Sequence, residues 1–412
     1  MRLFRQGSAA TDDPSLVIAD DTAAIRWFPS GAKSSEATSV DHSMVPARQQ
    51  SNIELKIRSM NCLLLSRYGR IGASSRMRFY QYLPFLESQH IHVETAALLD
   101  DSYIHNLNSG NSTDWASILG SYLKRVRSLA RSRQFDLVWV EAEVFPWLPD
   151  WGELWLSWRH IPYVVDYDDA AFHRYDLHSF AAVRWLLGHK IDRVMRHAAL
   201  VVAGNSYLAD RARQAGAAHI EIVPTVVDLG RYPVSLSHRG TNFVIGWIGS
   251  QSTTRYLLPL REVWRQATNW EGTSLRLVGS GALDLSGVAA DIMDWSESSE
   301  VQAVQSFTVG VMPLQDDPWA RGKCGYKLIQ YMACGLPVVA SPVGVNCEIV
   351  EHGLNGYLAT SEAEWLSALS QLRSQPQLCE EFGRAGRRKV ESTYSLEVTG
   401  PRLAELLRSA AN

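Results

Sequence analysis

Short apolar runs alternate with amphipathic segments along the chain after residue 57. The apolar runs have the length of β-strands and lie at residues 60–66, 137–142, 162–166, 199–204 and 220–224. Segments of helical character lie between them, at residues 76–88, 115–133, 181–198 and 207–216. Strands that alternate with helices are typical of a parallel sheet covered on both faces. The pattern predicts an α/β domain over residues 58–235.

A second series of the same kind follows the polar stretch "SLSHRGTN". Its strand-like runs lie at residues 243–250, 274–281, 291–295, 309–314 and 336–341. We therefore predict a second α/β domain over residues 236–395, and a final helix over residues 396–412 that can pack back on the first domain. Two doubly wound, Rossmann-like domains in tandem face a central cleft between the carboxyl ends of their strands, where such sheets bind ligands.

The first 57 residues have a different composition. Segments such as "GSAATDD" and "SGAKSSEATSVDHS" are small and polar, and only "LVIADDTAAIRWF" interrupts them. Such segments bury too little apolar surface to offset the entropy lost on ordering. Residues 1–57 are therefore predicted to form a largely disordered extension.

Composition and charge exclude several classes of protein. The 412 residues are 46% hydrophobic and 20% charged, which is ordinary for a soluble protein with two cores. The net charge of −3 lacks the basic excess of a nucleic-acid-binding protein. The five cysteines are scattered without a C-x-x-C spacing, which favours neither disulfides nor a zinc site. No apolar run reaches about 18 residues and no signal peptide is evident, so we expect a cytoplasmic protein.

The stretch Lys323–Gly344, "KCGYKLIQYMACGLPVVASPVG", predicts a loop, an amphipathic helix, a break and a buried strand. A helix N-terminus presents free N–H groups and about half a positive charge, so it favours an anion. Lys323 and Lys327 would strengthen such a site, which suggests a phosphate. A helix that opens at Thr253–Arg255, in "IGSQSTTRY", would make a second phosphate-facing turn. The alternative for these basic residues is an exposed position without a ligand.

Several ordered motifs carry a family resemblance. The segment "YKLIQYMACGLPVVASPVGVNCEIVEHGLNGYLA" resembles the C-terminal signature of retaining GT-B glycosyltransferases of the family-four, or group 1, type. The resemblance extends over roughly residues 60–395 and includes "GRIGASSRMR", "DYDDAAFHRYD", "AGNSYLADRA", "IVPTVVDLGRY" and "IGWIGSQSTTRYL". It implies a GT-B fold, with an N-terminal acceptor domain and a C-terminal domain for a nucleotide-sugar donor. That donor is a substrate, and no cofactor is implied.

The sequence departs from the family pattern at two positions. Two family glutamates, one for the donor sugar and one for the nucleotide ribose, fall on Gly322 and Gln330. Gln330 can still hydrogen-bond a ribose as donor and acceptor, whereas Gly322 has no side chain to offer. This indicates a divergent branch, with Lys323 and Lys327 in the same loop and first helical turn.

The resemblance implies further roles in donor binding. Arg255 and Lys327 would stabilise the leaving diphosphate, and Trp295 would stack on the nucleotide base unless it serves only in packing. Glycines that follow strands would let the backbone approach the donor phosphates or the acceptor, although each alone is an ordinary turn residue. Gly335 is expected instead to end a helix. The candidate donor-binding residues are Gly69, Gly72, Gly249, Ser250, Arg255, Trp295, Lys323, Lys327, Gln330 and Gly344.

The segment "PYVVDYDDAAFHRYD" places Asp166, Asp168, Asp169 and His173 at the carboxyl end of a strand. These residues could orient acceptor hydroxyls and supply a base. The D-x-D spacing could instead bind a divalent metal ion, as in GT-A transferases. A third interpretation is a haloacid-dehalogenase phosphatase, although its usual threonine is missing. We favour the first, without a metal, so the candidate catalytic residues are Asp168, Asp169, His173, Arg255 and Lys327.

These features together predict a metal-independent retaining glycosyltransferase that acts on a glycan or lipid-linked acceptor in polysaccharide or exopolysaccharide assembly. Same-face displacement, the mechanism that the resemblance implies, needs no protein nucleophile. The alternatives are a GT-B nucleotide-sugar epimerase and a non-catalytic nucleotide-sugar-binding protein. The aromatic segment "LPDWGELWLSWRHIP" and the basic face of "SYLKRVRSLARSR" have two interpretations. We favour covering helices with a solvated basic face, and peripheral contact at the inner face of the membrane is the alternative.

Overall fold

The computed structural model describes residues 59–103, 115–234 and 242–412. All of them belong to the second of the two units into which the chain divides, Lys56–Asn412. The disordered extension predicted over residues 1–57 lies outside the described residues. Among the helices of the described ranges, none combines the length and the apolar character that are needed to cross a lipid bilayer.

The N-terminal domain is built on a parallel sheet of six strands in the order β2-β1-β3-β4-β5-β6. The strands are β1 (Met60–Leu65), β2 (Ile91–Thr95), β3 (Leu137–Glu141), β4 (Tyr163–Tyr167), β5 (Leu200–Ala203) and β6 (Ile220–Ile222). The five predicted strands are confirmed; the inner ones are buried on both faces and therefore read as continuous apolar runs. The edge strand β2 was not predicted, because most of its residues are not buried and it lacks a continuous apolar run.

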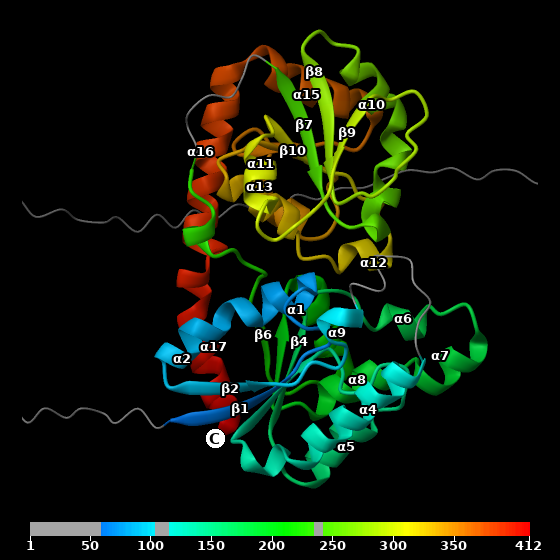
Figure 1. Cartoon of the computed structure of the whole chain (residues 1–412), viewed down its shortest axis with the longest axis vertical. Coiled ribbons are helices and arrows are strands. Elements are labelled where there is room, and N and C mark those ends of the chain that lie inside the picture. The colour runs from blue at the N-terminus through cyan, green and yellow to red at the C-terminus, as the bar shows by residue number, and fades with distance from the viewer. Residues whose placement is uncertain (1–58, 104–114, 235–241) are drawn as a thin grey trace, which may run out of the picture. The chain divides into compact units, whose positions relative to one another are not determined.

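Helices cover both faces of this sheet (Figure 1). They are α1 (Ala73–Arg78), α2 (Leu83–Ser88), α4 (Trp115–Ala130), α5 (Trp151–Trp158), α6 (His173–Asp176), α7 (Ala181–Leu187), α8 (Lys190–His197) and α9 (Ser206–Ala215), with short 3₁₀ turns at Tyr80–Tyr82, Ser132–Gln134 and Leu229–Arg231. The single helix predicted over residues 76–88 is wrong. The backbone leaves the helical region at Phe79, and Pro84, which lacks an N–H, is tolerated because it lies in the first turn of α2. The helix predicted over residues 181–198 is likewise divided into α7 and α8.

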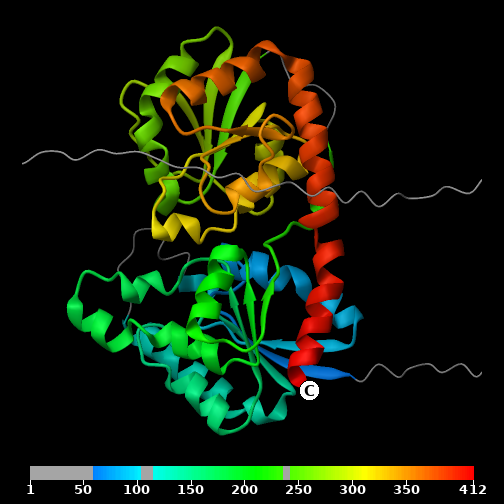
Figure 2. The same ribbon diagram turned by 180° about the vertical axis from the view of Figure 1, so that it is seen from behind.

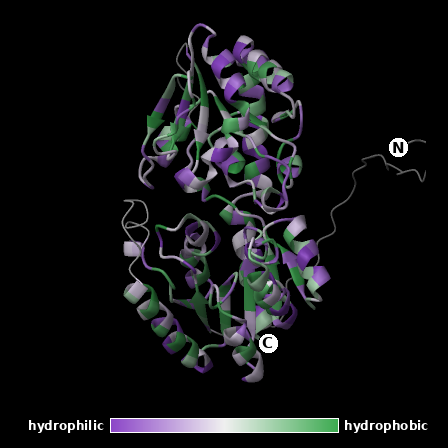
Figure 3. Ribbon diagram, turned by 90° about the vertical axis from the view of Figure 1, so that its right-hand side faces the viewer, coloured by the Kyte–Doolittle hydropathy of each residue, from purple (hydrophilic) through white to green (hydrophobic). Residues whose placement is uncertain are grey.

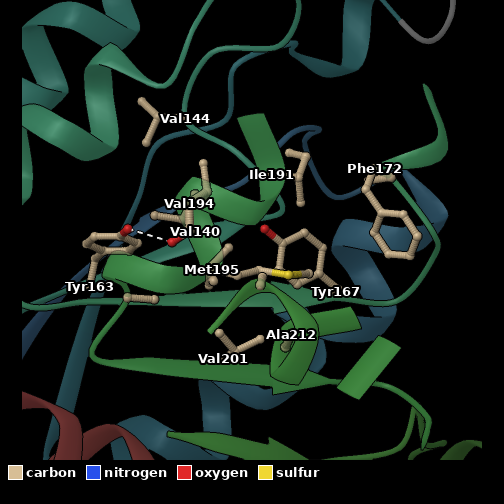
Figure 4. Close-up of a cluster of buried hydrophobic side chains, with 14 of the residues drawn as sticks. Val140, Val144, Tyr163, Tyr167, Phe172, Ile191, Val194, Met195, Val201 and Ala212 are labelled. Carbon is tan, nitrogen blue, oxygen red and sulfur yellow. Dashed lines mark hydrogen bonds between the residues drawn. The ribbon is translucent and has the colours of Figure 1, made fainter. Parts of the chain in front are cut away.

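One face of the N-terminal sheet packs against α8 and α9 (Figure 4). Val194 and Met195 of α8 and Ala212 of α9 are buried against the strands. The Tyr163 hydroxyl donates a hydrogen bond of 2.7 Å to the Val194 carbonyl. Because an unpaired buried hydroxyl would be costly, this bond both satisfies Tyr163 and ties α8 to β4.

The C-terminal domain repeats this plan, with a parallel sheet in the order β12-β11-β10-β7-β8-β9. The strands are β7 (Phe243–Ile248), β8 (Thr273–Val278), β9 (Ala290–Met293), β10 (Val309–Met312), β11 (Val338–Ala340) and β12 (Gly356–Leu358). Its helices are α10 (Arg261–Thr268), α11 (Glu300–Gln305), α12 (Pro318–Arg321), α13 (Tyr326–Ala333), α14 (Asn346–Ile349), α15 (Glu362–Ser374) and α16 (Pro376–Thr393), with 3₁₀ turns η4 (Gln251–Tyr256) and η5 (Leu258–Leu260). The five predicted strands are confirmed, and the three-residue β12 was missed. Figure 2 shows helices on the reverse side of both sheets.

The last helix, α17 (Leu396–Ala411), packs on the N-terminal sheet although it follows the C-terminal domain in sequence. Leu403, Ala404 and Leu407 are buried in the same cluster as Leu64 and Trp139 of β1 and β3. The helix thus completes one layer of the N-terminal domain.

Candidate functional site

The loop before α13 and the first turn of that helix carry two of the predicted donor-binding residues, Lys323 and Lys327. Gly325 caps the helix with φ +66°, in the left-handed region, and a Cβ there would lie 2.3 Å from Ile349 Cδ1. Glycine therefore allows α13 to begin abruptly. Lys323 lies in the loop, and Lys327 lies in the first helical turn.

This loop is held by residues of the N-terminal domain. Asn205, which caps α9, donates hydrogen bonds from Nδ2 to the carbonyls of Gly322 and Lys323, at 3.0 and 3.1 Å. The Cys324 thiol donates to the Asp168 carbonyl at 3.0 Å. Lys323 Nζ lies 3.5 Å from Asp169 Oδ2. The start of α13 is therefore attached to the carboxyl ends of β4 and β5.

Lys327 is a partly buried cation without a carboxylate partner. Its Nζ lies 4.8 Å from the centre of the Trp247 ring and 3.5 Å from Thr253 Oγ1, and among the described residues it makes no salt bridge. Burial, reinforced by the charge of Lys323, lowers the pKa of Lys327 to about 7. An ammonium group in this position lacks compensation, which an anionic ligand would supply.

The turn that follows β7 lies beside Lys327. A Cβ on Gly249 would lie 2.6 Å from the Trp247 ring and 2.9 Å from Lys327 Cε, so glycine makes room for both side chains. Ser250 precedes η4 and shares a 2.9 Å hydrogen bond with Ser252. The structure therefore brings together Gly249 and Lys327, two of the candidate donor-binding residues.

Arg255 lies at the end of η4 and is exposed. Its Nη2 donates to the Tyr256 hydroxyl at 2.9 Å, and its guanidinium lies 4.9 Å from the centre of that ring. The expected helix opening at Thr253–Arg255 is wrong, because Gln251–Tyr256 form a 3₁₀ helix of six residues. This short turn lacks the aligned peptide dipoles of a longer α-helix.

The two positions that depart from the family pattern have well-defined surroundings. A Cβ on Gly322 would lie 2.5 Å from Ala170 Cβ and 2.8 Å from its backbone nitrogen, so this arrangement has no room for a side chain. Gln330 is buried, and its Nε2 donates to the Tyr232 hydroxyl at 3.0 Å. The same hydroxyl lies 3.3 Å from Glu300 Oε1. Gln330 thus belongs to a buried polar network.

Trp295 belongs to the same region. Its Nε1 donates to Glu300 Oε2 at 3.1 Å, and the Arg76 guanidinium lies 4.9 Å from the centre of its ring. Arg76 is buried and lies 3.7 Å from Glu300, while its Nε and Nη1 have no hydrogen-bond partner. The structure thus joins the predicted base-binding residue to an arginine of α1 by a cation–π contact.

The remaining predicted glycines serve close packing. A Cβ on Gly69 would lie 2.3 Å from Asp101 Oδ1, and one on Gly72 would lie 2.3 Å from Tyr68 Cβ. Gly344 has φ +54°, and its Cβ would approach the Arg321 carbonyl to 2.7 Å. These contacts give each glycine a structural reason, whether or not it also faces a ligand. Gly335 follows Cys334, the C-cap of α13, and has φ +70°, as expected for a glycine that ends a helix.

The three aspartates of "DYDD" have different surroundings. Asp166 is buried at the end of β4, and its Oδ1 accepts from Arg78 Nε at 2.9 Å and lies 2.7 Å from Arg78 Nη2. Asp168 and Asp169 instead line a cavity of about 180 Å³. Burial, with the charge of Glu141 next in importance, raises the pKa of the Asp168 carboxyl to about 7.

Charged groups of both signs line this cavity. Besides the two aspartates, its wall includes Arg67, Glu141 and Arg174. Glu141, at the carboxyl end of β3, accepts from the Arg67 backbone N–H at 2.7 Å and from Ser74 Oγ at 2.8 Å. Glu141 was not among the predicted site residues, although it lies at the end of a buried strand, as the predicted aspartates do. The cavity could bind a polyhydroxylated ligand through several charged hydrogen-bonding groups.

His173 is not among the residues that line the cavity. Its Nδ1 lies 2.8 Å from Asp176 Oδ1, and its Nε2 lies 2.8 Å from the Tyr207 hydroxyl. Both ring nitrogens therefore have partners within the protein.

The described residues contain no group of three or more histidine, cysteine, aspartate or glutamate side chains that is placed to hold a metal ion. In the D-x-D pair, the Asp166 carboxylate is already engaged by Arg78. The same contact occupies the aspartate that a phosphatase would use as its nucleophile.

Comparison with known proteins identifies part of the chain. Residues 242–375 match the family described as Glycosyl transferases group 1, so the C-terminal domain contains a group 1 glycosyltransferase domain. Spore coat protein SA of Bacillus subtilis (strain 168) is 33% identical over 81 residues. That match covers 19% of this chain and about a fifth (20%) of the length of the curated relative.

Solved structures show the same fold over most of the chain. Anabaena HepE, in complex with UDP and glucose, superposes with a TM-score of 0.60 at 17% identity, covering 85% of this chain and 100% of HepE. Sucrose-phosphate synthase from Thermosynechococcus elongatus has a TM-score of 0.63 at 14% identity, covering 85% of this chain and 98% of that one. The predicted GT-B fold, with two Rossmann-like domains, is confirmed.

Proposed function

We propose that this protein is a retaining glycosyltransferase that moves a sugar from a nucleotide-sugar donor to a carbohydrate or lipid-linked acceptor. The reaction would serve polysaccharide or exopolysaccharide assembly in the cytoplasm, with peripheral contact at the inner face of the membrane. The group 1 domain over residues 242–375 supports the activity. The complex of HepE with UDP and glucose supports the kind of donor.

The observation that carries this proposal is the environment of Lys327. Its ammonium group lies in the first turn of α13, partly buried against Trp247, and makes no salt bridge with the described residues. A donor diphosphate would supply the missing negative charge, and the N–H groups at the start of α13 would add to the attraction.

The chemistry needs a stabilised leaving group more than a protein nucleophile. Negative charge grows on the departing diphosphate as the sugar–phosphate bond breaks, and fixed cations lower the energy of that state. Lys327 would supply this charge from α13, and Arg255 would supply it from η4. Gln330 would contact the nucleotide ribose, and Trp295 would contact the base. In our proposal no metal ion takes part in this step.

The acceptor would bind at the cavity beside β3 and β4. Asp168 and Asp169 line this cavity and would accept hydrogen bonds from acceptor hydroxyls. His173 lies at the start of α6, directly after the aspartate segment, and would help these aspartates to orient the acceptor. When the attacking hydroxyl is held next to the donor, less entropy is lost in reaching the transition state, so the transfer is faster.

A non-catalytic nucleotide-sugar-binding protein is the second candidate. Gly322 supplies no donor-sugar contact at a position where the resembling enzymes have a glutamate, and Ala170 fills the space in which a side chain would lie. In this second case the chain would still bind a nucleotide diphosphate at Lys327 but would transfer no sugar.

Incubation of the purified protein with a panel of nucleotide sugars separates these functions. Turnover that occurs only with an added acceptor, and gives a product that keeps the anomeric configuration of the donor, supports the proposed transferase. An isomerised donor identifies an epimerase. Binding without turnover over the whole panel of donors and acceptors contradicts the enzyme proposal and favours the binding protein.

A further inference from the structure

Exposed hydrophobic side chains are concentrated in one part of the N-terminal domain. Of the 18 large hydrophobic side chains that the described residues expose, 13 lie between Trp115 and Leu186. The other five are scattered over the remaining chain. Soluble proteins seldom leave large apolar patches in water, and such patches mark interaction surfaces.

Helix α4 has an apolar outer face in addition to its buried one. Its inner face buries Arg125 and Leu129. Trp115, Leu119 and Leu123 are exposed at successive four-residue intervals, with exposed fractions of 77%, 64% and 54%. Residues with this spacing lie on one side of a helix. The outer face is therefore a continuous apolar stripe that the domain core does not use.

Helices α5 and α7 carry similar exposed groups. In α5, Trp151, Leu154 and Trp158 follow each other at helical spacing and are exposed, while Leu156 is buried. In α7, Trp185 is 86% exposed. Tryptophan is expensive to leave in water, yet it is well suited to a boundary between water and an apolar phase.

The three helices contribute to one surface. The Tyr122 hydroxyl of α4 donates at 2.7 Å to the carbonyl of Pro146, beside Trp147. Trp147 meets His178 at a ring distance of 5.8 Å, and His178 stacks on Phe180, directly before α7, at 5.6 Å. Figures 1 and 2 agree in placing α4, α5 and α7 on the same side of the sheet. Figure 3, turned toward that side, shows hydrophobic segments on surface helices as well as in the sheet. We call the exposed faces of these helices the α4/α5/α7 surface.

The charge of this surface has one sign. Helices α4 and α7 contain no aspartate or glutamate, and the only one in α5, Glu153, is buried. Lys124 and Arg127 of α4 are exposed and form no salt bridge with the described residues. The surface thus combines tryptophans with basic groups that form no salt bridge with the described residues, and its helices expose no aspartate or glutamate. This combination complements an anionic phospholipid headgroup layer, where tryptophan is favoured and basic residues pair with phosphates.

We propose that the α4/α5/α7 surface binds the protein to a membrane that contains anionic lipids. The inference specifies the surface and the lipid class of the peripheral contact in the proposed function, on which it rests. Trp151, Trp158 and Trp185 enter the headgroup region, and Lys124 and Arg127 pair with lipid phosphates. Such docking would hold the N-terminal domain, with its cavity beside β3 and β4, close to lipid-linked acceptors.

Sedimentation with lipid vesicles tests this proposal without any nucleotide sugar. The full-length protein should pellet with vesicles of phosphatidylcholine mixed with phosphatidylglycerol, and much less with phosphatidylcholine alone. Combined Trp151→Ser, Trp158→Ser and Trp185→Ser substitutions should abolish pelleting. Lys124→Glu with Arg127→Glu should weaken binding to the anionic vesicles by more than about tenfold, because each basic residue near such a surface adds to the attraction. All five side chains are exposed in the protein, so the variants should remain folded.

Leu354→Ser provides the matched control, since it removes an exposed hydrophobic side chain from the C-terminal domain. Its vesicle binding should equal that of the wild type. Wild-type protein that stays in the supernatant with both vesicle types, or variants that pellet like the wild type, would overturn the proposal. A second copy of the protein could instead cover the surface. In that case the wild type would be a dimer that does not bind vesicles, and the tryptophan variant would be a monomer, which would also overturn the proposal. Because the assay needs no turnover, its result is independent of whether sugar transfer is found.

Discussion

At the scale of single residues, Lys327 makes the candidate site sensitive to pH. Its lowered pKa of about 7 means that the ammonium group is charged below this pH and neutral above it. A phosphate binds the charged form, so the dissociation constant of UDP-glucose should increase as the pH rises through about 7. Titration calorimetry over this range measures the effect.

Lys327→Arg is the control for this pH dependence, because a guanidinium stays charged throughout the range. Its affinity should be nearly constant across neutral pH. Equal pH dependence in the wild type and in this variant would assign the titration to another group.

Asp168 permits a separate test of the acceptor side. Its carboxyl lies after β4 of the N-terminal domain and lines the cavity, whereas Lys327 lies in α13 of the C-terminal domain and is not among the residues that line it. Asp168→Asn should therefore lower the rate of transfer while leaving donor affinity within a few fold. Transfer by the wild type should also survive a chelator. Activity that is lost with chelator and restored by manganese or magnesium would instead favour a metal bound at the aspartate segment.

At the scale of elements, the start of α13 depends on the left-handed conformation of Gly325. Gly325→Ala should lower the free energy of unfolding by about 1–2 kcal/mol for the backbone conformation, with a further loss from the contact with Ile349. Because the helix start positions Lys327, UDP-glucose affinity should fall as well. Urea denaturation and calorimetry measure the two effects.

Gly353→Ala is the matched variant, since Gly353 also has a positive φ, +80°, but a Cβ there meets no atom within 4 Å. It should lose a similar amount of unfolding free energy from its left-handed backbone conformation, and it should keep its affinity for UDP-glucose. If both variants bound equally weakly, the start of α13 would have no special part in the site.

The elements also show what the sequence could predict. Strands such as β3 and β4 were predictable, because a strand buried on both faces is a continuous apolar run. The edge strand β2 has no such run, and the break at Phe79 depends on local packing as well as on Pro84. For Lys327 the sequence indicated a helical turn with a positive charge. It could not predict the missing counter-ion, which depends on the folding of Trp247 and Gly249 against the lysine.

At the scale of the whole molecule, helix α17 packs on the N-terminal domain and should stabilise it, although it follows the C-terminal domain in sequence. Leu407 of α17 is fully buried beside β1 and β3. Leu407→Ala should lower the free energy of unfolding by about 2–5 kcal/mol, because it leaves a cavity in this layer. Val398→Ala on the same helix, where the side chain is 44% exposed, should cost much less. Equal losses in urea denaturation would contradict the packing of α17 on the N-terminal sheet.

The two domains also meet at the candidate donor loop through Asn205. Its Nδ2 bonds to the Gly322 and Lys323 carbonyls, and its Oδ1 caps α9. Asn205→Ser keeps a capping oxygen but loses the amide donor, whereas Asn205→Ala loses both. We expect both variants to weaken UDP-glucose binding, and Asn205→Ala to lose about 1 kcal/mol more of stability. Unchanged binding in both would remove Asn205 from the positioning of the loop.

The charge that Lys327 would offer to a diphosphate is the central feature of the proposed donor site. Calorimetric titration of UDP and of uridine into the wild type, Lys327→Ala and the exposed-lysine control Lys124→Ala measures this contribution. We predict that Lys327→Ala weakens UDP binding by about 1.5–3 kcal/mol and leaves uridine binding nearly unchanged, whereas Lys124→Ala binds both ligands like the wild type. Equal loss of affinity for UDP and uridine, or no loss for either, would contradict the assignment of Lys327 to the donor phosphates.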